Sequence, residues 1–208
     1  MSVLRTCGAS VAIIALGVGL LATTTHGFQT YTTESALRLS VGQAPRPVPG
    51  VRLQAANHET LGLTDFRGAW LVVGFMYTRC TTVCSVQGSG FALLHTLLQR
   101  RIESRQVRLL SISFDPQRDS PEALRHYQQR YGGALDGWFA ARPSNATDLQ
   151  TLLQTFGVQA IPNGLGGYEH NAAFNLVNPQ GQLVAILNWD DPQAVARYVQ
   201  AHVPPVQS

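Results

Sequence analysis

Two short apolar runs constrain the fold of this chain more than any other feature. Residues 70–77 (WLVVGFMY) are nearly all apolar, and residues 107–114 (VRLLSISF) are largely so. Runs of this length suit strands that are buried on both faces of a sheet. Between them, residues 84–101 have the apolar spacing of a helix, whose first part is weakened by Gly88 and Gly90. The order strand, helix, strand indicates an α/β protein.

The rest of the chain extends this pattern. A helix is predicted to begin at Ser120, which suits an N-cap because proline follows it, and another helix is predicted over residues 147–156. Residues 172–177 and 182–189 are predicted strands, joined by Asn-Pro-Gln-Gly in a type I turn, and a last helix starts at Asp191. This order predicts a three-layer α/β fold with a central mixed sheet, which is the order of the thioredoxin fold.

The N-terminal segment is predicted to anchor the chain in a membrane. Residues 8–23 form an apolar stretch, and Arg5 is the only charge before it. No A-x-A cleavage site follows, so an uncleaved anchor is preferred to a cleaved signal, with the domain on the extracytoplasmic (periplasmic) side. Residues 1–25 are assigned to this anchor, residues 26–50 to an extended, proline-containing linker, and residues 51–208 to the globular domain.

The charge pattern excludes one class of partner. The formal net charge is +3, and every one of the 15 basic residues is an arginine. These arginines are scattered, and no basic run is interleaved with aromatic residues. We therefore predict no nucleic-acid interface.

Two of the three cysteines lie where chemistry is expected. Cys7 precedes the apolar stretch and is expected to pack at its edge. Cys80 and Cys84 lie between a buried strand and a helix start, where backbone N–H groups and the helix dipole stabilise a thiolate. Arg79 can add to this effect if its side chain turns toward the sulfur. Positions four apart share one helix face, so the pair can form a structural disulfide, a redox couple or a metal clamp.

The spacing of this pair favours a metal ion. C-x-x-C is the usual dithiol redox spacing, whereas three residues separate Cys80 from Cys84. Thiolates are soft ligands that select Cu(I) or Zn(II). A structural zinc site needs four protein ligands, and the sequence holds no second cysteine pair, so two thiolates with one imidazole suit copper better. A plain structural disulfide remains open from spacing alone.

Three segments carry a resemblance to a known family. Residues 75–80 (FMYTRC) match an F-x-Y-T-x-C approach to the cysteine loop, and residues 113–121 (SFDPQRDSP) match S-x-D-P-x-R-D-T-P. Residues 168–171 (YEHN) match a D-H step before the hairpin. Together they resemble the SCO/SenC family, the thioredoxin-like copper-handling proteins of cytochrome c oxidase assembly, from about Gly50 to the end of the chain.

The resemblance implies a ligand set, a function and partners. Copper, as Cu(I), Cu(II) or both, is implied as the cofactor, held by Cys80, Cys84 and His170. The implied function is a metallochaperone rather than an enzyme. Its partners would be the copper-centre subunit of cytochrome c oxidase or another cuproprotein, and a thiol–disulfide reductant. Copper should bind only to the reduced pair, because a disulfide offers no thiolates.

The chain departs from the family pattern at three positions. Thr81 and Ser85 stand where family members have prolines, and Glu169 stands for the usual aspartate before the ligand histidine. These differences leave an alternative function open, an extracytoplasmic thiol–disulfide oxidoreductase. In it, Cys80 and Cys84 are the catalytic, redox-active pair, with Cys80 attacking and Cys84 resolving, and the histidine tunes their pKa values.

The acidic residues of the second motif have two interpretations. Asp115 and Asp119 can support the ligand residues, or they can cap the helix that begins at Ser120. Arg118 can pair with either carboxylate. None of the three is predicted to be a ligand, and the same holds for four histidines that lack a surrounding motif, namely His58, His95, His126 and His202.

Overall fold

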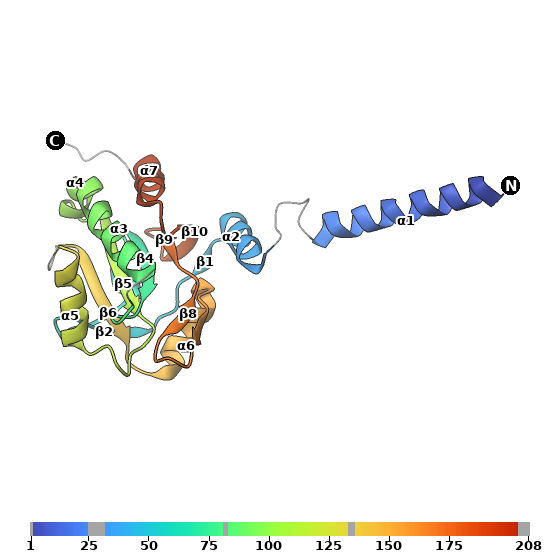
Figure 1. The fold of residues 1–208 in the computed structure, drawn as a ribbon. Helices are drawn as coiled ribbons and strands as arrows, with labels where there is room; N and C mark the ends of the chain where they lie inside the picture. Colours follow the sequence, from blue (N-terminus) through green and yellow to red (C-terminus); the bar gives the residue numbers. More distant parts are fainter. Residues whose placement is uncertain (1, 25–31, 81–82, 133–135, 204–208) are drawn as a thin grey trace. The chain divides into compact units, whose positions relative to one another are not determined.

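In the computed structural model, the described residues of the N-terminal unit, residues 1–43, form two helices (Figure 1). Helix α1 spans Ser2–Thr24. Its portion Thr6–Thr24 is long and apolar enough to cross a membrane, judged by length and composition alone. The structure describes residues 2–24, 32–80, 83–132 and 136–203. Thr81, one of the two positions where the family's loop prolines are replaced, lies outside these ranges.

The expectation of an extended linker over residues 26–50 is wrong for part of that segment. Helix α2 spans Thr33–Gln43. The side chain of Thr32 accepts a hydrogen bond from the backbone N–H of Ser35 at 3.1 Å, as an N-cap does. Arg38 and Glu34 form an ion pair at 2.6 Å across one helical turn. The prolines that favour an extended chain all follow this helix.

The second unit, residues 44–208, is built on an eight-stranded sheet with the order β1-β10-β9-β4-β5-β6-β2-β3. Strands β4, β5 and β6 are parallel, and the other pairings are antiparallel. The strands are β1 (Arg46–Pro47), β2 (Arg52–Ala55), β3 (Thr60–Gly62), β4 (Trp70–Met76), β5 (Val107–Ser113), β6 (Trp138–Pro143), β9 (Ala173–Val177) and β10 (Gln182–Asn188). A separate pair, β7 (Ala160–Pro162) and β8 (Tyr168–His170), forms a small hairpin. The sheet therefore begins slightly before the predicted domain start at residue 51.

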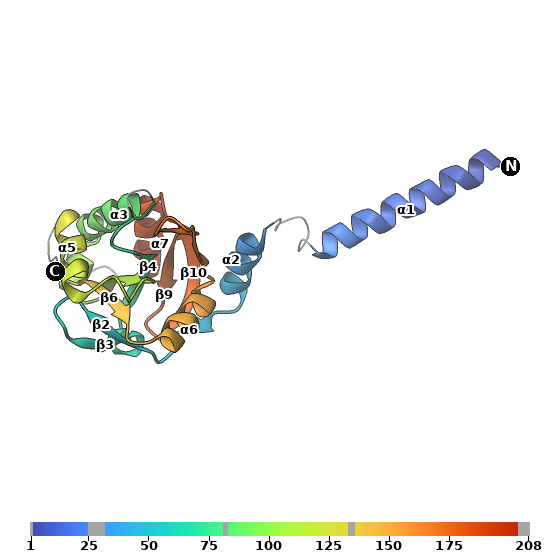
Figure 2. The same ribbon diagram turned by 60° about the horizontal axis from the view of Figure 1, so that its bottom comes forward.

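Helices cover both faces of this sheet, so the predicted three-layer arrangement is confirmed (Figures 1 and 2). The helices are α3 (Val83–Leu97), α4 (Gln99–Glu103), α5 (Pro121–Arg130), α6 (Ala146–Phe156) and α7 (Pro192–His202), with a 3₁₀ turn, η1 (Leu63–Phe66). Neighbouring residues of a strand point to opposite faces. Gly74 of β4 lies against Phe91 of α3, whereas the ring of Phe75 lies 5.3 Å from that of Phe156 in α6.

Helix α3 shows why its two glycines do not disrupt it. A Cβ atom at Gly88 would lie 2.6 Å from the ring of Tyr131, and one at Gly90 would lie 3.0 Å from the ring of Phe174. Both glycines therefore allow close packing, which offsets their low helix propensity. The predicted helix over residues 84–101 is interrupted at Leu98, which lies between the end of α3 and the start of the short α4.

The predicted start signals of the other helices are confirmed. Ser120 caps α5 by accepting a hydrogen bond from the N–H of Ala123 at 3.3 Å. Asp191 caps α7 in the same way. In the turn between β9 and β10, the N–H of Gly181 donates to the carbonyl of Asn178 at 2.9 Å. These local bonds fix the ends of elements whose packed faces form the core.

Candidate metal centre

The cysteine pair lies at the edge of the sheet where β4 ends. Cys80 follows this strand, and Cys84 lies in the first turn of α3. Both are free thiols in this structure, with exposed fractions of 4% and 1%. The backbone N–H of Cys84 donates to the Sγ atom of Cys80 at 3.3 Å. The predicted position of the pair, between a buried strand and a helix start, is confirmed.

His170 reaches the same place from a distant part of the chain. It is the last residue of β8, and its Nε2 atom lies 3.4 Å from the Sγ atom of Cys84. Its Nδ1 atom lies 3.0 Å from the backbone carbonyl of Asn171. Because a carbonyl can only accept a hydrogen bond, Nδ1 carries the proton in this contact, and Nε2 presents its lone pair toward the cysteines.

The ligand atoms of Cys80, Cys84 and His170 all lie within 4.8 Å of one another. Thiolate sulfurs bind metal ions such as zinc at about 2.3 Å, so an ion between two of them separates the pair by at most about 4.6 Å. A small inward movement would therefore let these three atoms hold one ion. Two sulfurs and one imidazole nitrogen form a soft donor set that fits Cu(I) or Zn(II) better than a hard cation.

The protonation of Cys84 differs from what its helix position alone predicts. The hydrogen bond with Cys80 and then burial raise the pKa of Cys84 above its ordinary value. The backbone N–H of Cys84, in the first turn of α3, donates to the sulfur of Cys80 and therefore does not stabilise a thiolate on Cys84 itself. In the absence of a metal, the pair therefore keeps a proton on Cys84.

Asp119 has a structural task that neither sequence interpretation described fully. It is fully buried, and it does not cap α5, because Ser120 does. Its carboxylate accepts hydrogen bonds from the backbone N–H of Thr78 at 2.9 Å, from the hydroxyl of Thr78 at 2.7 Å and from the hydroxyl of Ser113 at 2.5 Å. Burial raises the pKa of Asp119 above its ordinary value. Asp119 thus fastens the backbone two residues before Cys80 to the end of β5.

Asp115 forms ion pairs with two arginines beside the site, Arg79 and Arg118. Its carboxylate, 4% exposed as a residue, lies 3.2 Å from the guanidinium of Arg79 and 3.6 Å from that of Arg118. Both guanidinium groups also donate to the carbonyl of Gly166, at 3.1 and 3.4 Å. Arg79 therefore directs its charge to Asp115 and to the turn of the β7–β8 hairpin, and the expectation that it serves the cysteine sulfur is not supported.

Aromatic residues that sequence reasoning did not select surround the histidine. The rings of Tyr77 and Phe114 lie 6.0 and 5.0 Å from the imidazole of His170, and Tyr168 contacts both of these rings at 5.3 Å. The signal that could have identified two of them is position. Tyr77 and Phe114 directly follow the parallel strands β4 and β5, whose carboxyl ends meet at this edge.

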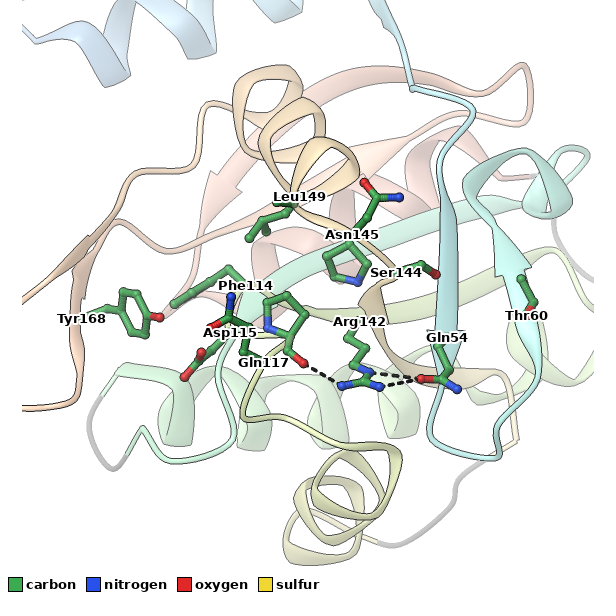
Figure 3. Close-up of a pocket in the computed structure, with 13 residues that line it drawn as sticks. Gln54, Thr60, Phe114, Asp115, Gln117, Arg142, Ser144, Asn145, Leu149 and Tyr168 are labelled. Atoms are coloured by element: carbon green, nitrogen blue, oxygen red, sulfur yellow. Dashed lines mark hydrogen bonds between the residues drawn. The ribbon is translucent and has the colours of Figure 1, made fainter.

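A cavity of about 600 Å³ lies beside the candidate metal centre but does not contain it. Phe114, Asp115 and Tyr168 line one side of it. On the opposite side, the guanidinium of Arg142 donates to the side chain of Gln54, as Figure 3 shows, and to the carbonyl of Pro116. The two cysteines and His170 are absent from its lining. None of the four other histidines named above belongs to the Cys80, Cys84 and His170 cluster.

The fold and the site together define a thioredoxin-like protein with a candidate metal centre. The domain has the thioredoxin-like arrangement of a mixed sheet between two helical layers. The loop after its first parallel strand carries a cysteine pair, and a histidine from a distant hairpin completes a cluster of three soft ligand atoms.

Comparison with known proteins identifies the family. The family model SCO1/SenC matches residues 49–203, so the chain belongs to the SCO1/SenC family. The SCO1 protein homolog of Bacillus subtilis is 26% identical over 137 residues, which cover 65% of this chain and 70% of that protein.

Solved structures agree with this assignment at the level of the fold. A SCO1/SenC family lipoprotein from Bacillus anthracis is 21% identical with a TM-score of 0.68, covering 76% of this chain and 97% of that one. ScoI of Bradyrhizobium japonicum, solved with copper bound, is 20% identical with a TM-score of 0.64, covering 76% of this chain and 99% of that one.

Proposed function

We propose that this protein is a copper-binding metallochaperone and that Cys80, Cys84 and His170 hold the copper ion as its cargo. The observation that carries the proposal is the convergence of these three ligand atoms within 4.8 Å of one another. Two of them, on Cys84 and His170, come from positions 86 residues apart in the sequence and lie 3.4 Å apart in the structure. Copper in the related ScoI structure supports the choice of metal.

The surroundings of the three proposed ligand residues favour metal binding. Burial of the two cysteines limits the access of water, so an ion held between them is protected from competing ligands. The hydrogen bond from His170 to the Asn171 carbonyl orients the imidazole and leaves Nε2 free to bind. Two thiolates favour Cu(I), and a low coordination number leaves a position through which an acceptor protein can take the ion.

We further propose where this transfer takes place and to which acceptor. The resemblance to the SCO/SenC family implies the copper-centre subunit of cytochrome c oxidase as the acceptor. Helix α1 would hold the domain at the membrane that contains such an enzyme, with the domain on the extracytoplasmic side. The lack of an A-x-A site after the apolar stretch supports an uncleaved anchor over a cleaved signal.

A Cu(I) titration of the full-length protein in detergent tests the metal proposal. Anaerobic, reduced protein is expected to take one equivalent of Cu(I) from a chromogenic chelator. Protein whose Cys80–Cys84 pair has first been oxidised to a disulfide is expected to take none, because its thiolates are consumed. The absence of uptake by reduced protein would contradict the proposal, and so would equal uptake by the oxidised form.

One contact favours a second candidate function, thiol–disulfide exchange. The N–H of Cys84 points at the sulfur of Cys80, which stabilises a thiolate there. That thiolate would attack a disulfide of another protein and release one of its sulfurs as a thiolate. Cys84 would then attack the Cys80 sulfur of the mixed disulfide and release the partner's second sulfur as a thiol, so two electrons pass to the partner and the Cys80–Cys84 pair becomes a disulfide. A His170→Ala variant that loses copper but still reduces disulfides would separate the two functions.

A further inference from the structure

Two buried amides lie directly behind the candidate metal centre. Gln87 of α3 and Asn175 of β9 are 1% and 2% exposed. The Nε2 atom of Gln87 donates to the backbone carbonyl of Ala173 at 2.9 Å. The Nδ2 atom of Asn175 lies 3.5 Å from the same carbonyl and 3.2 Å from the carbonyl of Val73 in β4. Both amides therefore converge on Ala173, the first residue of β9.

The contact of Gln87 runs alongside the contact between the proposed ligands. Gln87 follows Cys84 by three residues on one helix, so the two side chains share a face of α3. Ala173 follows His170 by three residues as well. The contact between Cys84 and His170 and the hydrogen bond from Gln87 to Ala173 thus join the same two segments, and the second contact lies three residues further along each segment.

Stability alone does not explain an amide at this position. The Oε1 atom of Gln87 and the Oδ1 atom of Asn175 are buried, and neither accepts a hydrogen bond within the described part of the chain. A buried acceptor without a partner is costly, and an apolar side chain of similar size would avoid that cost. Natural proteins keep buried polar atoms without hydrogen-bond partners mainly at functional sites.

We propose that Gln87 is a positioning residue, which fixes the distance between His170 and Cys84 by holding the start of β9 against α3. This role rests on the proposed copper site. It acts through the backbone between His170 and Ala173, and it is assisted by Asn175. Without the amide, β9 would still pair in the sheet through its neighbours β4 and β10, but the segment that carries His170 would lose its hydrogen bond to the cysteine helix.

The variant Gln87→Leu tests this role in full-length, reduced protein. Its thermal unfolding midpoint is expected to equal or exceed that of the wild type, because the partnerless acceptor is removed. Its Cu(I) affinity is expected to fall about 10- to 100-fold, the usual effect of losing a group that orients a metal ligand. In the metal-free protein, the imidazole ¹⁵N signals of His170 are expected to shift toward those of the exposed His126.

Gln128→Leu is the matched control. Gln128 is 6% exposed, and its amide donates at 2.8 Å to the carbonyl of Trp138 in β6, a strand that carries none of the proposed ligands. This variant is expected to lose stability, because it removes a donor without removing a partnerless acceptor, and to keep the copper affinity and the His170 signals of the wild type. The proposal is overturned if Gln87→Leu does not fold, if it loses stability but keeps its affinity, or if both variants lose affinity equally. A wild-type protein that binds no copper would contradict the proposed function. The imidazole ¹⁵N signals of His170 in the metal-free variants would still test the positioning role of Gln87.

Discussion

Full-length protein carrying Cys84→Ser is expected to bind Cu(I) at least about a hundredfold more weakly than the wild type. Structural zinc sites with four ligands gain roughly 10–16 kcal/mol, or about 3 kcal/mol for each ligand. Since 1.4 kcal/mol corresponds to a factor of about ten, loss of one ligand lowers the affinity about a hundredfold. The serine hydroxyl is a hard ligand that does not replace a thiolate for Cu(I). Competition with a chromogenic chelator measures this change.

The chain offers two matched controls for that measurement. Cys7→Ser removes an exposed cysteine of α1, and His126→Ala removes an exposed histidine that contacts Gln129. Both variants are expected to bind copper as the wild type does, whereas His170→Ala is expected to weaken binding as Cys84→Ser does. A Cys84→Ser variant with unchanged affinity would show that the ion is held elsewhere.

Asp119→Ala is expected to lower the free energy of unfolding at pH 7 by about 3–5 kcal/mol, since three buried donors lose their acceptor. These donors are the backbone N–H and hydroxyl of Thr78 and the hydroxyl of Ser113. Chemical denaturation of the metal-free protein measures the loss. Asp190→Ala, at an exposed position, is the control and is expected to change stability by less than about 0.5 kcal/mol. An equal, small effect of both substitutions would contradict the role assigned to Asp119.

The pH dependence of stability provides an independent check on Asp119. Its folded-state pKa lies above the ordinary value of 3.8 because the carboxyl is buried. The folded state therefore binds the proton more tightly than the unfolded state, so this contribution is fully present below that ordinary value and is lost as the pH rises through the folded pKa. Relative to Asp119→Asn, whose amide does not titrate, the stability of the wild type should fall as the pH is raised above about 4. A relative rise would show that the hydrogen bonds outweigh burial.

Elements with strong local signals were predictable from the sequence. The apolar runs that became β4 and β5, the N-cap of α5 and the turn after β9 depend on neighbouring residues, so their positions are encoded locally. The cysteine pair was predictable for the same reason, because its spacing and its place between a strand and a helix are visible in the sequence. Helix α2 was missed because its polar composition resembles a linker, although its capping residue was present.

Features that depend on distant contacts were not predictable in this way. Nothing local to Gln87 indicates that its amide meets Ala173, 86 residues away, or that its Oε1 atom lacks a partner. The task of Asp119 was hidden because its position just before a helix is also that of a capping residue. Placement of His170 depended on the family resemblance, since β8 belongs to a separate two-stranded sheet with no strong strand pattern.

X-ray absorption spectroscopy of the Cu(I)-loaded, full-length protein tests the central claim most directly, because it counts the atoms bound to copper. The account predicts two sulfur ligands and one nitrogen ligand in the wild type. It also predicts that only the nitrogen is lost in His170→Ala and that one sulfur is lost in Cys84→Ser. A copper ion bound mainly by nitrogen or oxygen atoms, or a spectrum that His170→Ala leaves unchanged, would contradict it.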